Sequence, residues 1–152
     1  MSESSFEEQL SQHGKLVYYN VGTSMMPLLR QHRDLMVIEK RPEGRLKKYD
    51  AVLYKRGEKY ILHRILRVTP TGYVICGDNC RKREFDITDE NILGVLTAVV
   101  RDGKEIAVTD TGYRCYVHLW CDLFPLRAAV LYGRDALRAV RRRLKRALKR
   151  LT

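Results

Sequence analysis

The chain has 152 residues and a formal net charge of +11 at pH 7; 45% of its residues are hydrophobic and 31% are charged. This length suits one domain with a sizeable core, and the composition excludes a wholly disordered chain. No run of apolar residues is long enough to predict a membrane-spanning helix. Residues 1–10 carry acid and lack an apolar core, so we expect no secretory signal.

The positive charge is concentrated near the C-terminus. From Arg134 to Arg150 there are nine lysines or arginines and one acid, Asp135, a balance of +8, which leaves about +3 for the first 133 residues. The globular part is therefore only mildly basic, and the high overall charge does not by itself indicate nucleic-acid binding.

The predicted elements begin with a short helix. Ser5 and Glu8 have the spacing of a capping box and Gly14 is a typical helix stop, so residues 5–13 should be helical. Short segments rich in β-branched and aromatic residues follow, separated by glycine and proline, and Asp102-Gly103 predicts a tight hairpin. The predicted strands are 15–21, 34–40, 50–55, 59–68, 72–76, 92–100 and 104–108.

This pattern predicts a mainly β fold: a compact antiparallel β domain with a short N-terminal helix and a C-terminal amphipathic basic helix. We divide the chain into an N-terminal helix (1–14), the β domain (15–112), and a tail that is first aromatic and then basic and helical (113–152).

In the tail, apolar residues recur at spacings of three and four, with basic residues on the other faces. Three interpretations stay open for 134–150: peripheral binding to an anionic inner-leaflet surface, packing against the β domain or a protein partner, and contact with nucleic-acid phosphate. The first two are weighted about equally and nucleic acid is not expected. The apolar positions are Leu137, Val140, Leu144, Leu148 and Leu151.

The cysteines do not form a recognisable metal or disulfide pattern. Their spacings, C-x3-C and C-x5-C, differ from a usual zinc knuckle, and we expect reduced thiols and no metal or organic cofactor. They stand at positions 76, 80, 115 and 121.

Three groups of polar residues stand in or next to the predicted strands, in the order Ser, His, Asp. Ser24 follows Gly22 in a turn, where its hydroxyl and backbone N–H can be exposed together, as acyl transfer requires. His63 lies inside an apolar strand, and Asp78 ends the strand after it. Without the other groups, Ser24 would be read as an ordinary turn serine and His63 as an ordinary core histidine.

Four motifs in order resemble the S24/S26 serine peptidases, which include type I signal peptidases and LexA-type self-cleaving domains. They are GTSMMPLL at 22–29, HRI at 63–65, GDN at 77–79 and the strand ILGV at 92–95, and the match runs from about residue 15 to 108. Because His63 stands where bacterial signal peptidases have lysine, the chain is most similar to the archaeal and endoplasmic-reticulum type.

The resemblance implies a serine peptidase with Ser24 as the nucleophile and His63 as the general base. An acid would orient the imidazole, and we favour Asp78 and Asp86 over Glu84, Asp78 having a structural role as the alternative. Backbone N–H groups of Thr23 and Ser24 would bind the oxyanion. The substrate groove would include Met25, Met26 and Pro27.

The chain also departs from the signal-peptidase pattern. Gly22 replaces the serine that usually precedes the nucleophile by two residues, and Tyr49-Asp50 and Arg33-Asp34 replace Gly-Asp pairs. Residues 1–23 include no apolar run long enough to cross a membrane, so we expect no membrane anchor of the usual kind before the nucleophile. The resemblance is therefore to small anchorless bacterial members, which implies a cytoplasmic enzyme, peripheral at the inner membrane face, that cleaves a leader, signal or precursor peptide bound along an exposed strand edge.

Two alternatives remain from other functional classes. The chain could be a noncatalytic module that binds a peptide or leader in the same groove. It could also be a LexA-type regulator without a DNA-binding domain, although no helix-turn-helix pattern occurs in the sequence.

Overall fold

The computed structural model describes residues 5–148, apart from the side chains at positions 124, 126 and 147. The chain begins with α1 (Phe6–His13), which has the expected caps: Ser5 and Glu8 form a capping box, and Gly14 closes the helix in a left-handed conformation. Leu10 is the buried residue of this helix and packs on the sheet.

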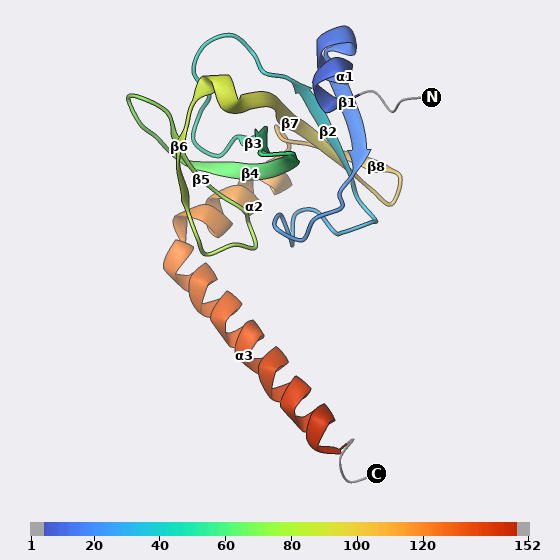
Figure 1. The fold of residues 1–152 in the computed structure, drawn as a ribbon, viewed down its shortest axis with the longest axis vertical. Helices are drawn as coiled ribbons and strands as arrows, with labels where there is room; N and C mark the ends of the chain where they lie inside the picture. Colours follow the sequence, from blue (N-terminus) through green and yellow to red (C-terminus); the bar gives the residue numbers. More distant parts are fainter. Residues whose placement is uncertain (1–4, 149–152) are drawn as a thin grey trace.

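Within the described residues, eight strands form one antiparallel sheet in the order β1-β2-β7-β3-β4-β5-β6, with β8 paired to β7 (Figure 1). A mainly antiparallel β fold is therefore confirmed. The strands are β1 (Lys15–Tyr19), β2 (Leu35–Lys40), β3 (Ala51–Arg56), β4 (Lys59–Val68), β5 (Tyr73–Cys76), β6 (Glu84–Ile87), β7 (Ile92–Arg101) and β8 (Lys104–Ala107), and a 3-10 turn, η1 (Asp89–Asn91), precedes β7.

Two hydrophobic clusters lie on opposite faces of the central strands because side chains alternate along a strand. On β3, Ala51 and Leu53 belong to the cluster that contains α1, whereas Val52 and Tyr54 belong to the other. β3 pairs with β4, on which Leu62 belongs to the first cluster and Ile65 to the second. Both strands of this hairpin are therefore anchored on both faces, which holds their polar side chains in defined directions.

Two helices follow the sheet: α2 (Thr111–Asp122) and α3 (Phe124–Leu148). Tyr113, Val117 and Cys121 on α2 are buried against the first cluster. α3 starts earlier than the predicted basic helix and projects away from the domain (Figure 1). Among the described helices, none has the length and apolarity needed to cross a bilayer. The last positions of the predicted helix, 149–151, lie outside the described residues.

Candidate active site

Ser24 lies in the turn that connects β1 to β2. The strand ends at Tyr19 rather than at residue 21, because the Asn20 side chain turns inward and donates to the carbonyl oxygens of Gly22 (2.7 Å) and Leu29 (3.3 Å). Ser24 is half-buried, and its hydroxyl makes no hydrogen bond within the described residues. The turn therefore leaves the hydrogen-bonding capacity of the Ser24 hydroxyl unused.

His63 is buried at the middle of β4, opposite Val52 of β3. Its Nδ1 lies 2.8 Å from Oε1 of Glu84, and the same carboxylate oxygen accepts a 2.8 Å hydrogen bond from the Tyr54 hydroxyl. The other oxygen of Glu84 pairs with Arg56 at 3.0 Å. The imidazole and the carboxylate are thus held in one hydrogen-bonded group at the edge of the second cluster.

The electrostatics of this pair suit a histidine that is neutral near pH 7. Burial lowers the pKa of His63 below its usual value, and the neighbouring Glu84 charge only partly opposes this shift. Burial also raises the pKa of Glu84, but hydrogen bonds and charge from Tyr54, His63 and Arg56 outweigh it, so that pKa lies below the usual value. When the Nδ1–H group donates a hydrogen bond to Glu84, Nε2 carries the free lone pair and can accept a proton.

The carboxylate next to His63 is Glu84, so the geometry does not support the preference for Asp78 and Asp86. Asp78 is fully buried and forms a two-bond pair with Arg64, with distances of 2.9 and 2.8 Å. Asp86 is exposed. His63 and Arg64 are consecutive on β4, so their side chains point to opposite faces, and each face has its own acid.

The predicted strands do not include β6, so in the sequence Glu84 falls between the predicted strands 72–76 and 92–100. In the structure β6 pairs with β5, and Glu84 lies opposite Ile75. The sequence contains a signal for this arrangement. His63 and Arg64 are adjacent on a predicted strand, so their side chains point to opposite faces, and the single aspartate of GDN can pair with only one of them. The acid for His63 then had to come from a later position.

The loop 77–80 joins the two halves of the site. The backbone N–H of Asn79 donates to the Ser24 carbonyl oxygen (2.7 Å), and the Asn79 side chain donates to the Thr23 carbonyl (2.9 Å). A Cβ on Gly77 would lie 2.6 Å from the Ser24 carbonyl oxygen and 2.9 Å from Nε2 of His63. Glycine is thus required here because the Ser24 turn and the His63 ring approach the same backbone position.

The backbone N–H groups of Thr23 and Ser24 donate to no acceptor within the described residues. Both lie at the start of the turn, where the N–H of Met26 donates to the Thr23 carbonyl oxygen and the N–H of Leu29 donates to the Met25 carbonyl oxygen. Free N–H groups beside a serine hydroxyl are the groups that an oxyanion hole requires.

A cavity of about 350 Å³ opens beside Ser24 between β1 and the first half of β4. Met25 lines it, but Met26 does not, and Pro27 lines a different cavity together with Tyr116 of α2. Of the predicted groove residues, the Ser24 cavity therefore includes only Met25. Its other walls are mostly aromatic and aliphatic: Phe6, Tyr18, Tyr19, Val21, Met36, Leu53, Tyr60, Ile61 and Leu62.

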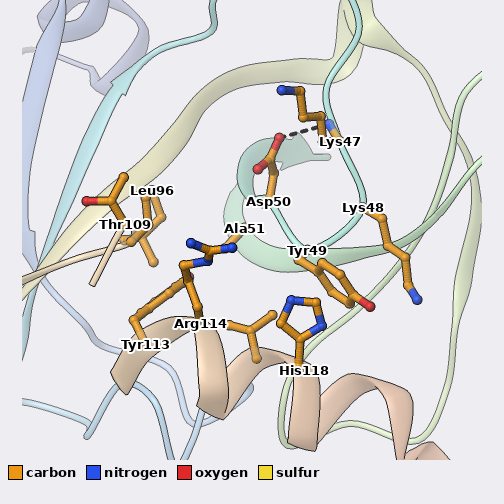
Figure 2. A pocket seen from close by; sticks show the side chains of 12 residues that line it. Lys47, Lys48, Tyr49, Asp50, Ala51, Leu96, Thr109, Tyr113, Arg114 and His118 are labelled. Atoms are coloured by element: carbon orange, nitrogen blue, oxygen red, sulfur yellow. Dashed lines mark hydrogen bonds between the residues drawn. The ribbon is translucent and has the colours of Figure 1, made fainter. Parts of the chain in front are cut away.

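A second cavity, of about 500 Å³, lies between α2 and the start of β3 (Figure 2). In this view the rings of Tyr49 and His118 lie side by side and meet edge to face, and Asp50 accepts a hydrogen bond from the Lys47 backbone. No serine or cysteine occurs among the described residues that line it. His118 pairs instead with Asp122 at 3.3 Å, so this cavity lacks the nucleophile and base that meet at Ser24.

The two C-terminal helices hold the active-site loop in place. Trp120 of α2 donates from its indole N–H to the Asp78 carbonyl oxygen (2.7 Å). Arg127 of α3 is buried and donates to the carbonyl oxygens of Gly77 and Cys80, each at 2.6 Å. These contacts connect the base of α3 directly to the loop that touches Ser24 and His63.

No protein-family model, no curated protein and no solved structure matches this chain. No group of His, Cys, Asp or Glu side chains in the described part of the chain has the arrangement of a metal site. The interpretation of the site rests on its own chemistry.

Proposed function

We propose that the chain is a serine endopeptidase of the S24/S26 type, with Ser24 as nucleophile, His63 as general base and Glu84 as the acid that orients the imidazole. The observation that carries this proposal is the convergence of three separate segments: the Ser24 turn, strand β4 and strand β6, held together by loop 77–80. A buried histidine with a carboxylate on Nδ1 and a serine turn beside Nε2 fits the logic of a catalytic triad.

In the proposed reaction, Nε2 of His63 accepts the Ser24 hydroxyl proton while Oγ attacks the peptide carbonyl carbon. The negative charge that develops on the carbonyl oxygen is stabilised by the N–H groups of Thr23 and Ser24. The C–N bond then breaks, and His63 gives its proton to the leaving amine. Water, deprotonated by the same imidazole, releases the acyl group and restores the Ser24 hydroxyl. Glu84 keeps Nδ1 protonated throughout.

The substrate would be an extended segment of a leader, signal or precursor peptide. β1 is an edge strand that pairs only with β2 within the described sheet, and the exposed side chains of Val17, Tyr18 and Tyr19 lead towards Ser24. An extended peptide can add to such an edge through backbone hydrogen bonds. The apolar cavity beside Ser24 would then take an apolar side chain near the cleaved bond.

The proposal includes a cytoplasmic location, peripheral at the inner membrane face. In the structure the cysteines are free thiols, as is usual in a reducing compartment. These are Cys76, Cys80, Cys115 and Cys121.

The test is mass spectrometry of a peptide-library digest by the wild type and by Ser24→Ala at equal concentration. We expect cleavage by the wild type and a loss of about 10⁴-fold or more in the variant, because the nucleophile is removed. Ser11→Ala, on the exposed side of α1, is the matched control and should cleave normally. Activity retained in Ser24→Ala would exclude Ser24 as the nucleophile.

A second candidate is a noncatalytic peptide-binding module, favoured by the absence of a hydrogen bond from the Ser24 hydroxyl to His63 within the described residues. An alkyl fluorophosphonate distinguishes the two, because it adds covalently to an activated serine. An adduct on Ser24 that is lost in His63→Ala supports the peptidase. If no adduct forms and no library peptide is cut, the binding module is the better interpretation.

A further inference from the structure

The outer part of α3 presents an uncovered apolar stripe. Val130, Leu137, Val140 and Leu144 are 53%, 63%, 52% and 58% exposed. At about 100° per residue they fall within an arc of about 80° on the helix. These exposed fractions show that the stripe does not pack on the sheet, and Figure 1 shows α3 leading away from the β domain. Of the interpretations left open for the tail, packing against the β domain is therefore not seen for these side chains.

The rest of the helix surface is cationic. From Arg134 to Leu148 there are seven basic residues and one acid, Asp135. Asp135 forms ion pairs with Arg81, Arg134 and Arg138. Beyond that point, within the described residues, no acid pairs with the basic side chains. These are Arg141, Arg142, Arg143, Lys145 and Arg146.

We propose that α3 binds an anionic lipid surface, lying in the plane of the interface with its apolar stripe turned towards the acyl chains. A helix with an apolar stripe and a cationic face fits both layers of such a surface at once: the aliphatic side chains leave water, and the guanidinium groups meet phosphates. The segment 134–148 is about 22 Å long, enough to lie along the surface.

Other occupants of the stripe fit less well. Two copies of this chain that packed stripe against stripe would bring the two Arg141 side chains and their cationic neighbours close together, with no described acid on α3 beyond Asp135 to compensate. Nucleic acid would satisfy the arginines through phosphate but would leave Leu137, Val140 and Leu144 exposed to water.

Lipid binding by α3 would also place the active site at the membrane. Arg134 donates to Oδ1 of Asn79 (2.7 Å), and the backbone N–H of that residue donates to the Ser24 carbonyl oxygen. The helix is thus connected by hydrogen bonds to the loop beside Ser24. The lipid-binding proposal itself does not depend on peptidase activity, so either can fail without the other.

The experiment is cosedimentation of the full chain with vesicles of phosphatidylcholine, with and without phosphatidylglycerol. The wild type should sediment only with the anionic vesicles, and less at high salt. Leu137→Ser with Leu144→Ser should reduce the partition coefficient by at least about tenfold. Replacing Arg141, Arg142 and Arg143 by glutamine should reduce it on the order of a hundredfold.

The controls remove the same groups elsewhere. Lys15, Lys40 and Lys104 are exposed on the β domain, and their joint replacement by glutamine removes the same net charge. Val68→Ser removes an apolar side chain that is 40% exposed. Both controls should bind anionic vesicles like the wild type. Circular dichroism of each variant shows whether α3 is still helical, and a loss of binding counts only for variants that keep their helix content.

Three results would overturn the proposal. The first is a wild type that fails to sediment with anionic vesicles. The second is a concentration-dependent dimer, detected by light scattering, that is lost in the double leucine variant. The third is duplex DNA binding that displaces the protein from vesicles and survives replacement of Leu137 and Leu144 by serine, because the apolar stripe would then have no part in binding.

Discussion

The two faces of β4 carry two acid–base pairs that differ in burial and surroundings. On one face His63 meets Glu84, which is partly open to solvent and also hydrogen-bonded to Tyr54. On the other, Arg64 and Asp78 are fully buried and pair through two hydrogen bonds. Arg64 stays protonated near neutral pH and cannot act as a base. Nε2 of His63, in contrast, can accept a proton and release it again in this pH range.

The difference separates a pair that holds the fold together from a pair with the surroundings that acid–base chemistry would need. Arg64 also donates to the Tyr49 carbonyl oxygen and to the Tyr113 hydroxyl, so that pair joins the sheet to α2. Asp78 accepts from Tyr116 of the same helix. The Arg64–Asp78 pair is thus structural, and the His63–Glu84 pair is the candidate for catalysis.

Glu84→Gln gives the sharpest test of this comparison. Removing the carboxylate charge while keeping the side-chain shape should lower the cleavage rate by about 10²- to 10⁴-fold, because protonated imidazole loses its stabilising partner. The measurement is kcat/KM on a peptide found in the library digest. Asp86→Asn, two residues away and exposed, is the control and should change the rate less than about twofold. Equal losses in both variants would contradict the assignment.

Asp78→Asn should show the opposite pattern. It leaves the buried Arg64 charge without a carboxylate, so we expect a loss of about 3–5 kcal/mol in the free energy of unfolding. The measurement is chemical denaturation of the variant beside the wild type. Activity per folded molecule should change far less than in Glu84→Gln, and an unaltered stability with abolished cleavage would instead assign Asp78 to the chemistry.

Gly77→Ala tests the contact between the two halves of the site. The added methyl group would meet the Ser24 carbonyl oxygen and the His63 ring, so the turn and the imidazole must move apart. Since a displacement of about 1 Å can cost about 10²-fold, we expect a loss of that order in kcat with the fold retained. Gly112→Ala is the matched control, because a Cβ there meets nothing within 4 Å.

The pH dependence should report His63 directly. Burial lowers the pKa of His63 below its ordinary value, so the active neutral form persists into mildly acidic solution, and the rate should fall only as pH drops through that lowered pKa. The negative charge of Glu84 raises the pKa of His63, so Glu84→Gln should shift the acidic limb to still lower pH. A limb above the ordinary histidine range would exclude this environment as its origin.

Much of the fold could be predicted because its signals are local. The capping box at Ser5, the left-handed stop at Gly14 and the Asp102-Gly103 hairpin each depend on neighbouring residues, and the structure has all three. β6 was missed because it is short and follows a basic segment, and its strand character depends on pairing with β5. Because β6 is absent from the predicted strands, the sequence analysis does not place Glu84 beside His63.

What the sequence by itself determined was therefore most of the strands, the capped N-terminal helix and the tight turns, with Ser24 and GDN at strand ends and His63 inside a strand, since periodicity and turn chemistry act over a few residues. Only the tertiary structure decided which acid meets which base, because strand pairing and the opposite faces of β4 separate Asp78 from His63 and bring Glu84 to it. It alone also decided that the apolar stripe of α3 lies uncovered, because packing against the β domain depends on the direction of the helix and not on its sequence pattern.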